Sequence, residues 1–236
     1  MYAISKTVIT DKVKHHGYHR YYEDFLNKYR DKKINFLEIG FWHGESAKLW
    51  LKYFEYGNIY SLDSDIRFFQ KYKINNDRFR YIKGDQGNLQ DLENVAKITG
   101  ACDVILDDGS HLPKHQLISF NYLFENCLRD GGVYIIEDIE TSYWKKGDLY
   151  GNEINEGPNS RTNIVNIFRV ILPIVNREFL NEKETKKIYD TKYVSKYVLD
   201  NISSLNFGMN CIIIKKMSNY EKQKFGNRPY RFSHFL

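Results

Sequence analysis

The sequence predicts an α/β fold built on a doubly wound, mostly parallel sheet. Three observations lead to this prediction. Apolar runs of strand length recur along the chain, segments with helical spacing separate them, and acidic or glycine-containing turns follow several runs. With 42% hydrophobic residues among 236, the chain can bury a sizeable core. We therefore expect one domain over residues 1–236.

Each predicted element follows from a local pattern. Apolar runs predict parallel strands at residues 34–40, 58–63, 78–84, 102–108 and 132–138. Connecting helices are predicted at residues 45–54, 66–72, 89–98 and 113–128. Residues 192–199 and 209–215 are predicted as a terminal antiparallel pair of strands. Together they predict a Rossmann-like sheet of seven strands.

Three segments do not follow this alternation. Residues 1–33 are predicted to form a helical extension that packs beside the sheet. Residues 141–160 form a polar stretch longer than ordinary connections, which predicts a substrate lid. Residues 163–180 carry a helical apolar stripe, which Pro173 should kink or end.

Composition excludes several classes of protein. No run approaches the ~18 consecutive apolar residues of a membrane span, and residues 1–10 lack the apolar core of a signal peptide. The net charge of +5 is not concentrated in any run, so no nucleic-acid partner is expected. The three cysteines, Cys102, Cys127 and Cys211, have no metal-type spacing and suit a reduced cytoplasmic protein. The sequence leaves open whether the chain forms a homo-oligomer.

The turn after the first predicted strand is a candidate cofactor loop. Gly40 and Gly44 lie where a doubly wound sheet lets a ligand approach the backbone, although Trp42 replaces the usual third glycine. Asp63 ends the second strand, where a carboxylate can accept hydrogen bonds from ribose hydroxyls. The alternatives are a tight strand-to-helix turn for the glycines and a helix cap for Asp63.

Glu38 favours one cofactor over another. An acid at the end of the first strand repels the pyrophosphate of a dinucleotide but attracts the cationic S-adenosylmethionine. Asp85 and Gln86 follow the third strand, where they are predicted to read the adenine edge. A turn with a capping aspartate explains these two residues equally well.

A second candidate site follows the fourth and fifth strands. Asp108 and the pair Glu137 and Asp138 come directly after apolar runs, so they should meet at the carboxyl edge of neighbouring strands. Crowded carboxylates favour a hard divalent cation, which predicts a Mg²⁺ site that Mn²⁺ or Fe²⁺ can also occupy. His111 lies three residues past Asp108 and is predicted to act as a general base. The alternatives are a turn and a solvated edge for the acids, and a cap for His111.

These residues resemble a known family, the metal-dependent class I S-adenosylmethionine O-methyltransferases that modify sugars of macrolide antibiotics (mycinamicin and tylosin type). Proteins similar to cephalosporin hydroxylases are more distant relatives. The likeness covers roughly residues 10–145. It is carried by residues 37–40 with Gly44 and Ser46, residues 106–111, residues 136–138 and 141–144, and the opening residues 10–12 and 16–18.

The resemblance implies a role for each site residue. It implies that Asp108, Glu137 and Asp138 hold the metal, and that His111 is the base. It implies S-adenosylmethionine contacts at Glu38, Gly40, Asp63, Asp85 and Gln86. The additional N-terminal domain that such enzymes often carry is not expected here, so oligomer contacts and acceptor choice are not carried over.

The function hypothesis is methyl transfer from S-adenosylmethionine to a sugar hydroxyl, with a nucleotide-linked sugar, a glycan or a natural-product saccharide as acceptor. Lys145, Lys146 and Arg161 would suit an anionic substrate. Tyr143 and Trp144 are predicted either to help line a water-poor site or to serve as ordinary packing or lid anchors. A catechol-type methyltransferase is the nearest alternative. Glu38 argues against an NAD-dependent oxidoreductase, and the lack of a basic helix argues against an RNA methyltransferase.

Overall fold

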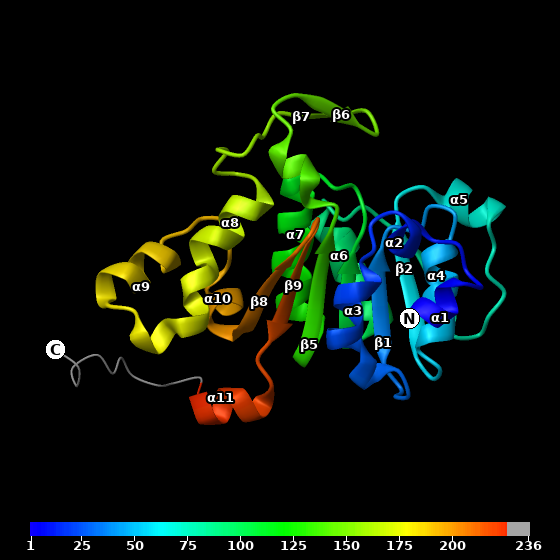
Figure 1. Ribbon diagram of the computed structural model, residues 1–236, viewed down its shortest axis with the longest axis horizontal. Helices are drawn as coiled ribbons and strands as arrows, with labels where there is room; N and C mark the ends of the chain where they lie inside the picture. Colours follow the sequence, from blue (N-terminus) through cyan, green and yellow to red (C-terminus); the bar gives the residue numbers. More distant parts are fainter. Residues whose placement is uncertain (226–236) are drawn as a thin grey trace.

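The computed structural model describes residues 1–225 and contains a seven-stranded sheet in the order β3-β2-β1-β4-β5-β9-β8 (Figure 1). The first five strands pair in parallel, and β9 runs antiparallel to both β5 and β8. The strands are β1 Asn35–Ile39, β2 Asn58–Asp63, β3 Phe79–Lys83, β4 Cys102–Asp107, β5 Leu128–Glu137, β8 Ile202–Gly208 and β9 Cys211–Lys216. The predicted fold class and the five parallel strands are confirmed. The strand order reverses between β1 and β4, where open α/β sheets bind ligands.

Helices cover both faces of this sheet (Figure 1). One face packs against α1 Tyr2–Ser5, α2 Asp11–Lys14, α3 His19–Leu26, η1 Asn27–Tyr29, α4 Glu45–Tyr53 and α5 Ile66–Lys71. The other face packs against α6 Leu89–Thr99, α7 Pro113–Asn126, α8 Ile164–Ile171, η3 Leu172–Phe179, α9 Glu182–Tyr189 and α10 Lys196–Asn201. The remaining helices are η2 Ile139–Tyr143 and α11 Asn219–Phe225. The predicted extension over residues 1–33 does pack beside the sheet, because Tyr22 and Leu26 share a core with Phe36 and Trp50.

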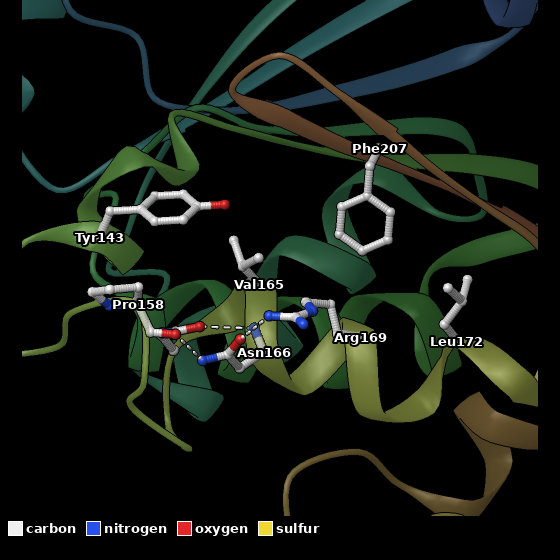
Figure 2. Close-up of a pocket in the computed structure, with 8 residues that line it drawn as sticks. Tyr143, Pro158, Val165, Asn166, Arg169, Leu172 and Phe207 are labelled. Carbon is white, nitrogen blue, oxygen red and sulfur yellow. Dashed lines mark hydrogen bonds between the residues drawn. The ribbon is translucent and has the colours of Figure 1, made fainter.

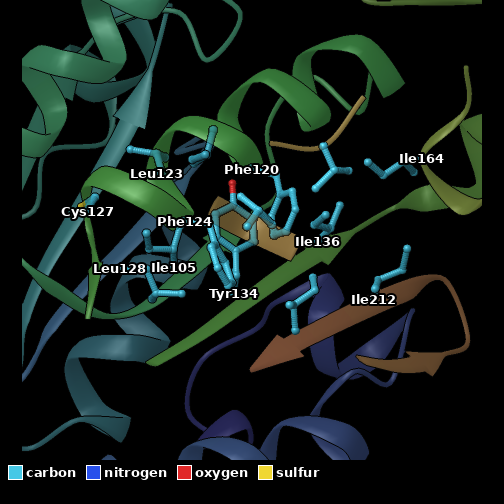
Figure 3. Close-up of a cluster of buried hydrophobic side chains, with 14 of the residues drawn as sticks. Ile105, Phe120, Leu123, Phe124, Cys127, Leu128, Tyr134, Ile136, Ile164 and Ile212 are labelled. Atoms are coloured by element: carbon cyan, nitrogen blue, oxygen red, sulfur yellow. The ribbon is translucent and has the colours of Figure 1, made fainter. Parts of the chain in front are cut away.

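Strand alternation assigns each side chain to one of these two cores. On β5, Tyr134 and Ile136 lie in the core beneath α7, where Tyr134 meets Phe120 with ring centroids 5.1 Å apart (Figure 3). Val133 and Ile135 lie in the opposite core, which α2, α3 and α4 cover. Because the period along a strand is two, Glu137 falls on the face that α2 covers.

The same alternation separates two neighbouring aspartates. Asp107 is buried on the α7 side, where its carboxylate accepts hydrogen bonds from Ser119 Oγ at 2.6 Å and Gln86 Nε2 at 3.0 Å. Asp108 follows Asp107 and bonds instead to Lys12 of α2. At the end of β4, one carboxylate therefore lies on the α7 side of the sheet and the next on the α2 side.

The prediction of a strand at residues 192–199 is wrong. Residues Lys196–Asn201 form helix α10, and Ser195 caps its start by accepting a hydrogen bond from the backbone N–H of Val198 at 3.2 Å. The partner of β9 is instead β8, whose Ser- and Asn-containing sequence is typical of a turn. Val198 and Leu199 are buried, so tertiary packing overrides their preference for a strand.

Residues 141–160 contain more structure than the predicted loop. After η2 the chain forms a two-stranded hairpin, with β6 at Gly147–Leu149 and β7 at Asn152–Ile154, which projects above the sheet (Figure 1). Further along, α8 ends at Ile171, just before Pro173, as the sequence predicts. Among residues 1–225, no helix is both long enough and apolar enough to cross a lipid bilayer.

Candidate active site

A cavity of about 850 Å³ lies at the carboxyl ends of the parallel strands, where the strand order reverses. Seven of the predicted site residues line it: Gly40, Asp63, Asp85, Gln86, Asp108, His111 and Asp138. Glu38, Gly44 and Glu137 are not among its lining residues. The structure therefore brings most of both predicted sites to one opening.

The turn after β1 depends on its glycines for reasons internal to the chain. Gly40 has φ +99°, and a Cβ there would lie 2.1 Å from the main-chain oxygen of Asp108. Gly44 has φ +72° and begins α4. Asp63 Oδ2 accepts hydrogen bonds from the backbone N–H groups of Phe41 at 2.9 Å and Trp42 at 3.3 Å. Glycine and aspartate thus hold the turn against β2 and β4, whatever ligand binds above it.

Glu38 lies in the interior, so the structure does not support direct contact with a cofactor. Its carboxylate is fully buried and accepts hydrogen bonds from Ser46 Oγ at 2.8 Å and Trp50 Nε1 at 3.1 Å. Burial raises the pKa of this carboxyl to about 7, although the nearby ammonium of Lys12 opposes the increase. Glu38 anchors α4 to the sheet beneath the cavity.

Asp85 and Gln86 lie on the cavity wall but bond within the protein. Asp85 Oδ1 accepts a hydrogen bond from the backbone N–H of Gly87 at 2.7 Å, which is the capped turn of the alternative interpretation. Gln86 Oε1 accepts one from the backbone N–H of Ser110 at 2.6 Å, while its Nε2 donates to Asp107. The Gln86 amide therefore ties the turn after β3 to the turn after β4.

Three of the four residues predicted for metal binding and catalysis converge on one point, and Glu137 is not part of this group. Potential ligand atoms of Asp108, His111 and Asp138 all lie within 4.8 Å of one another. His111 Nε2 lies 3.7 Å from Asp138 Oδ2. Both residues have positive φ, 55° and 52°, which is a costly conformation for residues other than glycine. Such strain at two neighbouring positions is typical of functional sites.

Asp138 is held from two sides. Its Oδ1 accepts hydrogen bonds from the hydroxyl of Tyr18 and from Asn210 Nδ2, the latter at 3.0 Å. Burial and the neighbouring carboxylates raise the pKa of the Tyr18 phenol, so Tyr18 remains a donor. The second carboxylate oxygen, Oδ2, is the one that faces His111.

Glu137 is tied to a lysine that the sequence interpretation did not assign to the site. Lys12 Nζ donates to Glu137 Oε2 and to Asp108 Oδ2, and lies 3.7 Å from Glu38 Oε1. Burial raises the pKa of Glu137 to about 8, with the charge of Lys12 acting against the increase. Burial lowers the pKa of Lys12, but the three carboxylates more than reverse this and hold it well above its ordinary value.

These residues fit a divalent cation. Glu137 Oε1 is buried and has no hydrogen-bond partner among residues 1–225, and an unpartnered carboxylate oxygen is costly unless something binds it. Carboxylate oxygens select hard ions such as Mg²⁺. Asp108 and Asp138 therefore lie together with His111, whereas Glu137 is joined to Asp108 only through Lys12.

Sequence reasoning missed several residues around the cavity. Lys12 and Tyr18 occur in the opening motifs of the resemblance, but no pattern showed that they reach the acidic strand ends. Tyr150 is at the tip of the hairpin, and its ring centroid lies 6.2 Å from those of both Trp42 and His111. Aromatic rings thus lie over the cavity, but they are not the predicted ones.

Tyr143 and Trp144 do not line this cavity. Tyr143 borders a separate hollow of about 420 Å³, into which Phe207 and Arg169 also point (Figure 2). Trp144 packs against Gly147 at the base of the hairpin. The expectation that these two aromatic residues line the reaction site is not supported.

The sheet order and the cavity at its switch point define the class I methyltransferase fold. No family model matches the chain. It is 30% identical over 203 residues to mycinamicin VI 2''-O-methyltransferase of Micromonospora griseorubida, and 29% identical over 203 residues to demethylmacrocin O-methyltransferase of Streptomyces fradiae. Each match covers 83% of this chain and 49% of the relative, so the chain spans about half the length of these proteins.

A solved structure extends the comparison. The MycE methyltransferase of mycinamycin biosynthesis, in complex with Mg, SAH and mycinamycin VI, superposes with a TM-score of 0.74 at 27% identity. The match covers 93% of this chain and 54% of that one. The chain is therefore a homologue of O-methyltransferases that act on sugars of natural products, and the resemblance inferred from its motifs is confirmed.

Proposed function

We propose that this protein transfers a methyl group from S-adenosylmethionine to a sugar hydroxyl and requires a divalent cation. The observation that carries the proposal is the convergence of Asp108, His111 and Asp138 within 4.8 Å on the cavity wall. The homology to sugar O-methyltransferases, whose structural representative was solved with Mg and SAH, supports the same activity.

S-adenosylmethionine would occupy the part of the cavity above β1, β2 and β3. Gly40 and Asp63 border it there, and Asp85 lies on the wall beyond β3. In our proposal Gly44 and Gln86 shape this surface through the turns that they hold, and Glu38 supports it from below through α4. The cofactor supplies the methyl group as an activated cation.

Asp108, Glu137 and Asp138 would hold the cation, and Mg²⁺ suits these oxygen ligands best. When bound, a dication acts as a Lewis acid that makes a sugar hydroxyl easier to deprotonate. The protein's own contribution is to fix the carboxylates in place: Tyr18 and Asn210 hold Asp138.

His111 would remove the proton from the acceptor hydroxyl. Its imidazole is nearly buried at the cavity wall, and its main-chain oxygen accepts a hydrogen bond from Thr141 Oγ1 at 2.7 Å, which fixes the residue. The hydroxyl oxygen then forms a bond to the methyl carbon as the bond from carbon to sulfur breaks, and the proton stays on His111. A positioned base of this kind contributes roughly 10²–10⁴-fold to the rate.

The acceptor would enter beneath the hairpin of β6 and β7, within the predicted lid at residues 141–160. Tyr150 and Asn152 bring this hairpin to the cavity wall. Exposed Lys145, Lys146 and Arg161 near the hairpin suit an anionic acceptor such as a nucleotide-linked sugar. We further propose that the protein works in the cytoplasm on small molecules, without nucleic-acid partners.

A direct test is to incubate the protein with S-adenosylmethionine and Mg²⁺ against a panel of glycosylated natural products, sugar nucleotides and catechols. Mass spectrometry should detect a methyl increment on a saccharide, and chelation of the metal should abolish it. Calorimetric titration should show binding of S-adenosylhomocysteine and none of NAD. Methylation of catechols with no saccharide modified would contradict the proposed acceptor class, and binding of NAD instead would contradict the proposed chemistry.

A further inference from the structure

Lys12 is the most deeply buried cation in contact with the candidate metal ligands. It belongs to the four-residue helix α2, before the first strand, yet its side chain is 2% exposed. Its ammonium reaches carboxylates from three adjacent strands of the sheet, those of Glu38 on β1, Asp108 after β4 and Glu137 on β5. A lysine rarely pays this desolvation cost without such partners.

Lys12 engages one oxygen of each candidate ligand that it touches. It bonds to Asp108 Oδ2 and to Glu137 Oε2. The other oxygen of Glu137, Oε1, has no hydrogen-bond partner among residues 1–225. The ammonium therefore fixes the rotation of the Glu137 carboxylate and leaves that second oxygen unbonded.

The charges around this point also balance. Four carboxylates meet at the end of the sheet, those of Glu38, Asp108, Glu137 and Asp138. When all four are ionised, one ammonium leaves most of this negative charge uncompensated, whereas an ammonium together with a dication nearly neutralises it. Lys12 and a metal would thus be complementary here, because the metal would take carboxylate oxygens that Lys12 leaves free.

We propose that Lys12 is a positioning residue for the metal: its ammonium holds Asp108 and Glu137 in the orientation in which they bind the dication. The inference rests on the proposed function, because it concerns the same cation. Groups that orient metal ligands in this way typically contribute roughly 10–100-fold to metal affinity.

The test is Mn²⁺ binding to the whole chain without cofactor or acceptor, measured by electron paramagnetic resonance. Lys12→Met should weaken Mn²⁺ binding roughly 10–100-fold. If Lys12 were only a neighbouring charge, its removal would relieve repulsion and tighten Mn²⁺ binding, so the two roles predict opposite signs. Lys14→Met is the matched control, because Lys14 lies exposed on the same helix and should leave the affinity unchanged.

Thermal unfolding of each variant shows whether it is folded. A second, conservative variant keeps the inference testable if Lys12→Met fails to fold. Lys12→Arg keeps the charge, but its planar guanidinium cannot occupy the position of the ammonium, so Mn²⁺ binding should again weaken severalfold. Wild-type affinity in Lys12→Arg, or unchanged or tighter binding in a folded Lys12→Met, overturns the inference. If the wild-type protein itself fails to bind Mn²⁺, the proposed metal requirement fails, and the inference falls with it.

Discussion

The buried Glu137 makes the stability of the metal-free protein depend on pH. Burial raises its pKa from 4.5 to about 8, so the folded protein keeps a proton that the unfolded chain has already lost. The free energy of unfolding should therefore fall as the pH rises from about 4.5 to about 8. At about 1.4 kcal/mol per pH unit, the full effect is on the order of 5 kcal/mol.

The assay is urea unfolding of the chelator-treated protein between pH 5 and 8, followed by circular dichroism, with Glu137→Gln for comparison. The wild type should lose several kcal/mol over this range, and Glu137→Gln should lose less, because the amide has no proton to lose while Glu38, whose pKa is also raised, to about 7, still loses one there. Glu55→Gln, at an exposed position, should follow the wild type. Added Mg²⁺ should stabilise the wild type more at pH 8 than at pH 6, because a cation binds the ionised carboxylate. Parallel curves for wild type and Glu137→Gln would refute this account of Glu137.

Three further predictions concern single side chains. His111→Ala should lower methyl transfer by roughly 10²–10⁴-fold while leaving the affinity for S-adenosylhomocysteine, measured by calorimetry, almost unchanged; near-normal turnover would remove its role as the base. Gly40→Ala places a Cβ 2.1 Å from the main-chain oxygen of Asp108 and should lower the melting temperature by at least several degrees, whereas an unchanged value would mean that the turn can shift freely. Arg177 donates hydrogen bonds to the carbonyls of Ile174, Leu199, Asp200 and Ile202, so Arg177→Met should destabilise the protein by roughly 3 kcal/mol in urea unfolding; a loss below about 1 kcal/mol would show that water replaces these bonds.

Much of the fold was predictable because most of the parallel strands contain a short apolar run that is buried on both faces. The segment containing Tyr134 and Ile136 is an example, since no polar residue interrupts it before Glu137. Of the terminal strand pair, only β9 was predictable from the sequence. In β8 the residues Ser203 and Ser204 favour a turn locally, and only pairing with β9 makes them a strand.

The candidate site was likewise predictable only in part. Asp108 and Asp138 were predictable because acids that end adjacent parallel strands must meet at the same edge of the sheet. The position of Lys12 was not predictable, because its contacts with Asp108 and Glu137 span 96 and 125 residues. Local periodicity in the sequence carries no information on contacts between residues so far apart. The same alternation that buries Ile135 also turns Glu137 toward α2, so the face of each acid could have been read once the strand registers were known.

The peptide unit between Asp107 and Asp108 connects the two helical layers that cover opposite faces of the sheet. The Asp107 carboxylate accepts hydrogen bonds from Gln86 and Ser119, so the turn after β3 and helix α7 are both bonded to the residue next to a candidate metal ligand. The β3 side of the cavity is therefore connected to the ion-binding side through hydrogen bonds and one peptide unit, with no loop between them.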